Sequence, residues 1–144
     1  DCIKYANKVC IGSVPYVREK KRSTKKKRYL NIMDTALNPD FKEAIRIVRN
    51  KVERSTKEHE LKTILVTSAL AGEGKSTIAV NLAISLAQEG KKVALVDCDL
   101  RNPSNAMILG VKLEKGLTDY LTKKAKFNEC IGYLTTSINN GTKN

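Results

Sequence analysis

Two short motifs in the sequence contain residues that can bind a phosphate group and a metal ion. The first is the stretch ALAGEGKS, Ala69 to Ser76, which matches the pattern GxxxxGK(S/T) except for the alanine at its first position. Gly72 and Gly74 let backbone N–H groups turn toward an anion, while Lys75 supplies a positive charge and Ser76 a hydroxyl group for Mg²⁺. The motif therefore predicts a nucleotide phosphate site. The alternative is a glycine turn followed by Gly-Lys-Ser by chance.

The second motif is a pair of aspartates, Asp97 and Asp99, which end the apolar stretch KKVALVDCD. Residues 97 and 99 share one side of an extended strand, whereas Cys98 points to the other side, where we expect a small core residue. Two carboxylates beside a triphosphate repel it unless Mg²⁺ lies between them or one of them acts as a base. In the alternative interpretation the aspartates only cap the next turn, with Asp99 accepting backbone N–H groups near Asn102.

The elements around these motifs are predicted to form a βαβ unit. Residues 61–69 and 91–99 are apolar and are expected to be two buried strands, and residues 75–89 have a helical pattern that ends at Gly90. Strands joined by such a crossover are parallel, and the crossover is right-handed. Both motifs then lie at the carboxyl edge of the sheet, where ligands of open α/β sheets bind. Two short helices are expected further along, in SNAMILG and GLTDYLTKKA.

A further helix is predicted before this unit, over residues 38–55. Asn38 is a natural N-cap, Pro39 suits the first helical position, and Asp40 complements the helix dipole. One face of the helix is apolar, with Phe41, Ile45, Val48 and Val52. The opposite face is expected to be polar and to carry Glu43, Arg46, Arg49, Asn50 and Glu53.

Length and composition limit the function classes. The chain has 144 residues, enough for one domain, and a net charge of +12, most of which lies in the segment Arg18–Arg28. This segment is expected to be a solvated linker beside an anionic membrane surface, or only a solubilising linker. Nucleic-acid binding is not expected, because no aromatic residues interleave the charges. The cysteine spacing argues against a zinc site, and the lone His59 is expected to be exposed.

The motifs resemble those of the bacterial tyrosine kinases of capsule and exopolysaccharide synthesis. The loop SALAGEGKST and the strand ending DCDLRNP are similar to the Walker A and Walker A′ motifs of these kinases. The stretch EAIRIVR resembles their ExxRxxR motif, CIGSVPYV their segment just inside the second membrane helix, and GLTDYL their segment after the second strand. Partition and cell-division ATPases usually carry an extra lysine early in the loop, where this chain has Leu70 and Ala71.

The resemblance implies a P-loop NTPase of the α/β class, a parallel sheet with flanking helices, and the cofactors ATP and Mg²⁺. By this resemblance, Asp97 would be the base that accepts the proton of a tyrosine hydroxyl. Lys75 and Asp99 would be the other catalytic residues. Ser76 and Asp99 would bind Mg²⁺. The residues expected to bind nucleotide are Gly72, Glu73, Gly74, Lys75, Ser76, Thr77 and Arg101. Those expected to join subunits into a ring are Glu43, Arg46 and Arg49.

The same resemblance predicts how the chain is organised. Residues 1–36 would be a juxtamembrane-like segment and basic linker, and residues 37–144 the N-terminal part of a tyrosine kinase domain. The later strands of the family, with a further Mg²⁺ aspartate, have no counterpart, so these 144 residues are expected to be C-terminally incomplete and inactive alone. The expected partners are a ring of copies and a polysaccharide co-polymerase, fused or separate, at the cytoplasmic face of the plasma membrane. The alternatives are a partition-type or cell-division-type ATPase and a non-catalytic scaffold.

Overall fold

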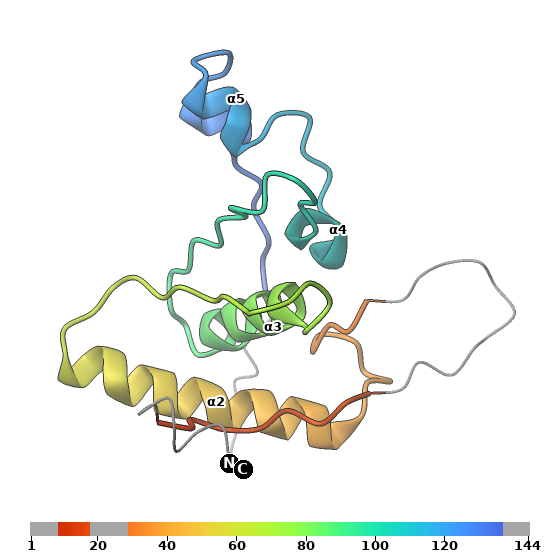
Figure 1. Ribbon diagram of the computed structural model, residues 1–144, viewed down its shortest axis with the longest axis vertical. Helices are drawn as coiled ribbons and strands as arrows, with labels where there is room; N and C mark the ends of the chain where they lie inside the picture. Colours follow the sequence, from red (N-terminus) through yellow and green to blue (C-terminus); the bar gives the residue numbers. More distant parts are fainter. Residues whose placement is uncertain (1–8, 18–28, 137–144) are drawn as a thin grey trace, which may run out of the picture.

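The computed structural model describes residues 9–17 and 29–136, and the regular elements in these ranges are helices (Figure 1). They are α2 (Pro39–Glu58), α3 (Lys75–Gln88), α4 (Asn105–Leu109), α5 (Leu117–Leu121) and the 3-10 helix η1 (Phe127–Cys130). Helix α2 packs against α3, α3 contacts α4, and α5 packs with η1 at the far end of the molecule. None of the helices in these ranges is long and apolar enough to cross a bilayer.

Helix α2 begins as the sequence predicts and ends one turn later than expected. The side chain of Asn38 accepts a hydrogen bond from the backbone N–H of Asp40 at 2.7 Å, and Pro39 occupies the first helical position. The helix continues beyond the predicted end at Ser55 as far as Glu58. His59 then caps the helix, with its ring Nδ1 2.9 Å from the carbonyl oxygen of Ser55, and it is exposed as expected.

The apolar face of α2 forms the first of two cores. Phe41 and Ile45 are buried with Leu37, and side chains from residues 9–17 and 29–32 pack against them. Residues 9–17 run along α2 (Figure 1). A Cβ atom added to Gly12 would lie only 2.9 Å from Cγ2 of Val48, so a larger side chain there would require the neighbour to move. The segment before the basic linker is therefore part of the packed structure.

The second core lies on the other side of α3. Val80 and Ile84 of α3 are buried against Ile108 of α4, and Tyr29 and Leu95 pack around them. Because α3 contributes to both cores, through Ile78 to the first and through Val80 and Ile84 to the second, it is the central element of the fold. The helix predicted at residues 75–89 is thus confirmed in position, from Lys75 to Gln88.

The two segments predicted as buried strands differ from that expectation. Within the described residues, 61–68 and 91–99 are neither helix nor paired strand, and no backbone hydrogen bond joins them. Their apolar side chains are also exposed: Leu65 is 85% exposed and Val96 58%. A buried parallel strand needs a hydrogen-bonded neighbour at each edge and cover on both faces. Helix α3 covers only one face, so the expected burial is not achieved.

Candidate nucleotide-binding site

The phosphate loop connects the first extended segment to α3. Gly72 and Gly74 have φ angles of 84° and 89°, a region that side chains with a Cβ rarely adopt. The loop is held by Glu73, whose carboxylate accepts the backbone N–H of Leu70 at 2.9 Å, and by Ser68, whose hydroxyl donates to the carbonyl of Leu70 at 3.0 Å. The glycines thus allow the conformation of the turn, as the motif predicts, while the carboxylate of Glu73 stabilises the loop by a hydrogen bond within it.

Helix α3 starts directly after the loop, at Lys75. Its N-cap is Gly74, and no side chain caps the first turn. The N–H groups of a first turn have no partner inside the helix, and the helix dipole adds a partial positive charge at the same place. Ser76 and Thr77 lie in this turn and are half-buried. These groups together fit a phosphate bound at the start of the helix.

Lys75 and Asp99 bring the two sequence motifs together. The Nζ atom of Lys75 lies 3.1 Å from Oδ2 of Asp99, and both side chains are about one-third exposed, at 36% and 34%. The hydrogen bond from Lys75 lowers the pKa of Asp99 below its usual 3.8, and the backbone N–H of Asn102 adds to this effect. The carboxylate therefore stays ionised and faces the loop, where its negative charge can balance the positive charge of a metal ion or of Lys75.

Asp97 organises the chain that follows. Its Oδ1 accepts the N–H of Asp99 at 3.1 Å, and its Oδ2 accepts the N–H groups of Ser104 and Asn105, both at 2.9 Å. Asp97 therefore joins the extended segment to the start of α4. The turn-capping role considered as an alternative is present for both aspartates, because Asp99 also accepts from Asn102 at 3.1 Å.

The predicted alternation of side chains between the two sides of this segment is confirmed, but the predicted burial of Cys98 is not. Residues 95, 97 and 99 are half-buried, whereas 96, 98 and 100 are exposed. Asp97 and Asp99 therefore share one side. Cys98 is exposed and is not the core residue that we expected, because nothing in the described chain covers the second face of this segment. Arg101, expected near the nucleotide, is exposed beside Asp99 in the sequence.

A buried asparagine supports the site and was missed by the sequence analysis. Asn81 is fully buried, and its amide donates to the carbonyls of Leu30 at 2.8 Å and of Thr77 at 2.7 Å. Its side-chain oxygen accepts the N–H of Ile32 at 2.7 Å. A polar residue within the apolar stretch Ile78–Ile84 of the helix could have indicated such a contact.

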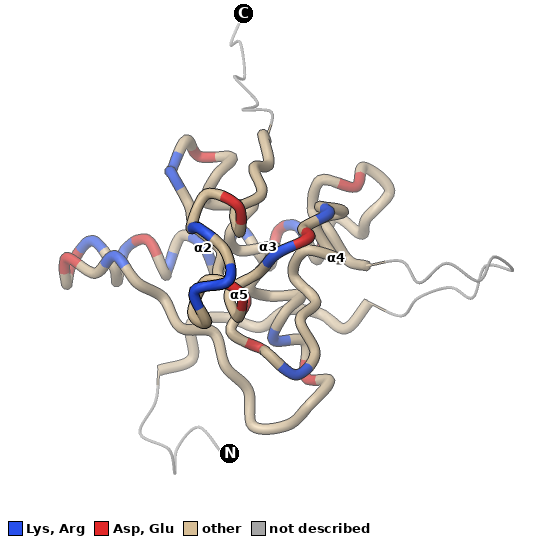
Figure 2. Tube along the Cα trace, turned by 90° about the horizontal axis from the view of Figure 1, so that it is seen from above, with Lys and Arg blue, Asp and Glu red and all other residues tan. Residues whose placement is uncertain are grey.

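Arg49 does not lie where the sequence analysis placed it. Its side chain is only 10% exposed and its Nη1 donates to Oε1 of Glu89 at the end of α3 at 2.7 Å. Arg46 and Glu43, in contrast, form an exposed ion pair on the outer face of α2. Figure 2 shows basic and acidic residues interspersed along this helix. The predicted charged face is therefore divided, with Arg49 joining α2 to α3 and only Glu43 and Arg46 facing outward.

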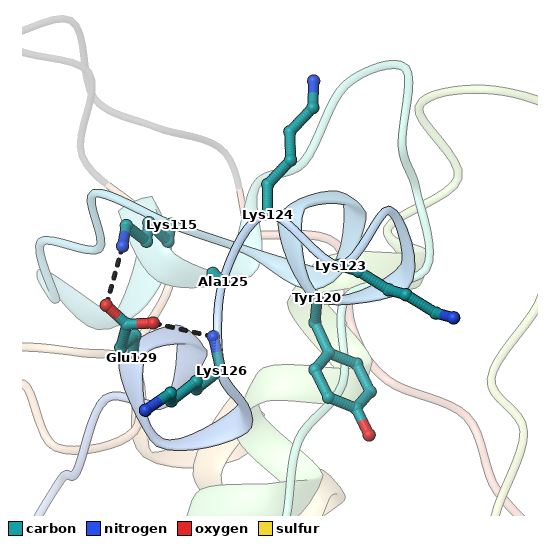
Figure 3. A pocket seen from close by; sticks show the side chains of 7 residues that line it. All are labelled: Lys115, Tyr120, Lys123, Lys124, Ala125, Lys126 and Glu129. Atoms are coloured by element: carbon teal, nitrogen blue, oxygen red, sulfur yellow. Dashed lines mark hydrogen bonds and ion pairs between the residues drawn. The ribbon is translucent and has the colours of Figure 1, made fainter.

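A separate shallow pocket of about 450 Å³ lies beside α5 (Figure 3), and no residue of the phosphate loop lines it. Lys115 pairs with Glu129 at 2.7 Å, and Glu129 also accepts the N–H of Lys126 at 2.7 Å. Tyr120 stacks edge-to-face on Phe127, with ring centroids 5.6 Å apart. These contacts stabilise the local fold of the chain around α5 and η1, and they explain why these side chains lie together.

Comparison with known proteins places the site in a family. Residues 60–135, just over half of the chain, match the family model ParA, described as the NUBPL iron-transfer P-loop NTPase. The chain is 40% identical over 89 residues to the tyrosine-protein kinase YwqD of Bacillus subtilis, covering 62% of this chain and 38% of that protein. It is 38% identical over 105 residues to the tyrosine-protein kinase CpsD of Streptococcus agalactiae, covering 71% of this chain and 45% of that protein.

The architecture has a counterpart among solved structures. The kinase domain of the Escherichia coli tyrosine kinase ETK superposes with a TM-score of 0.73 at 23% identity, covering 90% of this chain and 52% of that domain. At this identity the match supports the fold and not the activity. The chain spans less than half the length of the two kinases named above, and about half of the ETK domain.

Proposed function

The chain belongs to the ParA family of P-loop NTPases, and from this premise we propose that it is the nucleotide-binding part of a bacterial tyrosine autokinase of capsule or exopolysaccharide synthesis. The observation that carries the proposal is the contact between Lys75 and Asp99 at 3.1 Å. It joins the phosphate loop to the aspartate pair of a DCDLRNP ending, and this ending separates the tyrosine kinases from the partition-type ATPases. The names of the similar proteins YwqD and CpsD agree with this choice.

The residues present fit ATP and Mg²⁺. Two glycines with positive φ, an uncapped helix start and a lysine form a cradle for phosphate oxygens. The Ser76 hydroxyl and the ionised Asp99 carboxylate are oxygen donors of the kind that Mg²⁺ prefers, directly or through water. When bound, Mg²⁺ would neutralise charge on the transferred phosphoryl group.

The chain's own residues would act in two ways. Lys75 would exchange its contact with Asp99 for the phosphates, which releases the Asp99 carboxylate toward the metal site. Asp97 already accepts three backbone N–H groups, and a carboxylate offers about four lone-pair positions. One position is then left to accept the proton of a tyrosine hydroxyl. The three backbone bonds would hold that carboxylate in a fixed orientation.

Nucleotide binding is tested by thermal unfolding with MgADP. Binding to the folded state stabilises it by about 2.7 kcal/mol at a hundredfold excess over Kd. We expect this shift for the wild type and for the control Lys123→Met, which removes an exposed lysine near α5, and we expect its loss in Lys75→Met. Equal shifts in all three proteins would refute the phosphate site.

A second measurement tests the roles of Asp99 separately. Without Mg²⁺, Asp99→Asn releases Lys75 and removes a negative charge, so ADP should bind more tightly, by up to about fivefold. With Mg²⁺, the same change removes a candidate metal ligand, so the gain should disappear or reverse. A variant that weakens ADP binding equally in both conditions would contradict the assignment of Asp99 to the metal.

Kinase activity belongs to the whole protein and is tested there. Incubation of the full-length protein with ATP should give phosphotyrosine, and Asp97→Asn should abolish it while MgADP binding persists. We expect no phosphorylation by the 144 residues alone. ATP hydrolysis by the full-length protein without phosphotyrosine would favour the partition-type or cell-division-type ATPase. Absence of nucleotide binding would favour a non-catalytic scaffold.

Ring assembly is proposed through the outer face of α2. The exposed pair Glu43 and Arg46 remains available to a neighbour, and an arginine can bind a carboxylate with two parallel hydrogen bonds. Changing both to alanine should reduce the oligomer size of the full-length protein in sedimentation velocity. The matched control changes Arg54 and Glu58, another exposed pair of α2, and should leave the distribution unaltered. If the two double variants have the same oligomer size, the proposed contact between subunits through Glu43 and Arg46 is excluded.

The membrane partners are proposed from the sequence alone, because the segment Arg18–Arg28 lies outside the described residues. Each basic residue near an anionic surface contributes about 1 kcal/mol to binding, and salt screens this attraction. The chain should therefore sediment with acidic vesicles at low salt and be released at high salt, as expected of a segment at the anionic cytoplasmic face of a membrane. Equal sedimentation with neutral vesicles would support a merely solubilising linker.

A further inference from the structure

The turn after α5 places a lysine in a backbone conformation that favours glycine. Lys123 has a φ angle of 60° and donates its backbone N–H to the carbonyl of Tyr120 at 3.0 Å, while the N–H of Lys124 bonds to the carbonyl of Asp119 at 2.8 Å. These two bonds form a Schellman motif, in which the residue with positive φ is usually glycine. Because backbone strain of this kind clusters at functional sites, it points to a binding role for the side chain of Lys123.

Three lysines around this turn have no acidic partner among the residues that the structure describes. The pocket beside α5 is lined by four lysines and one acid, Glu129. The Glu129 carboxylate already binds the Nζ atom of Lys115 and the backbone N–H of Lys126, both at 2.7 Å. Lys123, Lys124 and the side chain of Lys126 form no ion pair there. Four positive charges and one negative charge therefore leave the pocket with an excess of three positive charges.

Two aromatic rings lie exposed beside these lysines. Tyr120 is 43% exposed and Phe127 63%, although their rings stack edge-to-face on each other. Exposed aromatic side chains provide apolar contact area for a partner, and such residues are enriched at protein interfaces. The turn thus combines positive charge with an apolar platform. We call the group Tyr120, Lys123, Lys124, Lys126 and Phe127 the lysine–aromatic surface.

The arrangement of the charges favours an extended partner over one small anion. Figure 3 shows the side chains of Lys123, Lys124 and Lys126 projecting from the turn in different directions, so they do not converge on a single point. The two contacts of Glu129 show that this part of the chain accepts a carboxylate, with one oxygen on a lysine and the other on a backbone N–H. Several carboxylates along one chain would match the divergent lysines, and charge complementarity would set the orientation of that chain.

The place of the surface in the fold favours a polypeptide over a membrane. Helices α5 and η1 lie at the far end of the molecule from α2 and from residues 9–17, which run along α2 (Figure 1). The basic segment Arg18–Arg28, for which a membrane contact is proposed above, follows residues 9–17 directly in the sequence. A bilayer near that segment would leave the α5 end free for a partner in solution.

We propose that the lysine–aromatic surface binds an acidic polypeptide segment of a partner protein. The carboxylates of the segment would contact the three lysines, and one of its aromatic or apolar side chains would cover Tyr120 and Phe127. Lysines contribute charge and on-rate to such a contact, whereas the buried aromatic contact contributes most of its affinity. The surface shares no residue with the phosphate loop, and the inference does not depend on nucleotide binding or kinase activity.

The experiment uses the 144-residue chain and a fluorescent peptide of about ten residues, in which glutamates flank a central phenylalanine. Because the chain has a net charge of +12, any acidic peptide is attracted to it, so the control must remove the same charge elsewhere. At about 0.15 M salt, Lys124→Gln combined with Lys126→Gln should weaken binding roughly fivefold, measured by anisotropy. Lys51→Gln combined with Lys57→Gln, at two exposed positions of α2, should change affinity by less than about twofold. Equal weakening by both pairs would indicate attraction by net charge alone and would overturn the proposal.

A glycine variant separates binding from folding. Lys123→Gly relieves the positive φ angle, so Tm should not fall, whereas the peptide should bind about twofold to threefold more weakly. Unchanged affinity would remove Lys123 from the surface.

The peptide and a membrane arm test the occupant itself. Replacing the central phenylalanine of the peptide by serine should weaken binding at least about threefold, because the contact with Tyr120 and Phe127 is lost. Equal affinity of the two peptides would refute the aromatic platform. Sedimentation with acidic vesicles that is lost on Lys124→Gln combined with Lys126→Gln would identify a membrane contact and refute a polypeptide occupant.

Discussion

Replacement of Arg49 by methionine tests how α2 is attached to α3. Methionine keeps an apolar stem of similar length and removes the guanidinium group, which donates to Glu89 at 2.7 Å, to Ser85 at 3.4 Å and to Asn50 at 2.8 Å. A hydrogen bond to a charged partner contributes about 1.5–3 kcal/mol when it is protected from water. Glu89 is 51% exposed and can be rehydrated, which reduces the loss.

We therefore expect Arg49→Met to lower the free energy of unfolding by about 2 kcal/mol. At roughly 3 °C per kcal/mol for a chain of this size, Tm should fall by about 6 °C. The assay is urea and thermal unfolding followed by far-UV circular dichroism. Arg46→Met, which breaks the exposed pair with Glu43, is the matched control and should leave Tm within about 1 °C of the wild type.

A double-mutant cycle isolates the contact itself. Arg49→Met and Glu89→Gln, separately and together, should give a coupling energy of about 1 kcal/mol. If Arg49→Met unfolds like the wild type, or if its only effect is on subunit assembly, the packing of α2 on α3 derived above is wrong. If Arg46→Met lowers the free energy of unfolding as much as Arg49→Met does, this account of the packing is also wrong.

Two other outcomes follow from buried and charged contacts. Asn81→Leu leaves the N–H of Ile32 and the carbonyl of Leu30 half-buried without these partners, so the free energy of unfolding should fall by about 1–3 kcal/mol, measured by urea denaturation; no change would show that these hydrogen bonds do not stabilise the fold. The pKa of Asp99 is lowered by Lys75, so the stabilisation is present above the unfolded value and is lost as pH falls through the lower folded-state pKa. In Lys75→Met, a carboxyl NMR titration should show a higher pKa that still lies below 3.8, because the N–H of Asn102 remains; an unchanged value would contradict the pair.

Local signals in the sequence were enough to predict the α-helices of the described residues, although not the 3-10 helix at Phe127–Cys130. Asn38 and Pro39 mark the start of α2, and Gly90, with a φ angle of 80°, follows the end of α3, because caps depend on a few neighbouring residues. The phosphate loop was predictable for the same reason, since its glycines and Lys75 lie within one turn of chain.

Features that depend on distant partners were predicted less well. Residues 61–69 have the composition of a buried strand, but a strand also needs edges to pair with, and the described chain provides none. Arg49 follows Ile45 by four residues and so lies near the buried stripe, a position that the sequence analysis assigned to the outer face. Its partner Glu89 belongs to another helix, and no local pattern predicts that pairing.

The side chain of Asn81 connects the start of the nucleotide-binding helix to Leu30 and Ile32, which follow the basic linker in the sequence. One side chain bonds both to the carbonyl of Thr77, in the first turn of α3, and to the backbone of Leu30 and Ile32. A pull on residue 30 must therefore either break these bonds or displace the helix that carries Lys75. Tension applied to residue 30 would therefore reach the first turn of α3 through these three hydrogen bonds, together with the packing of Leu30 and Ile32 against the cores.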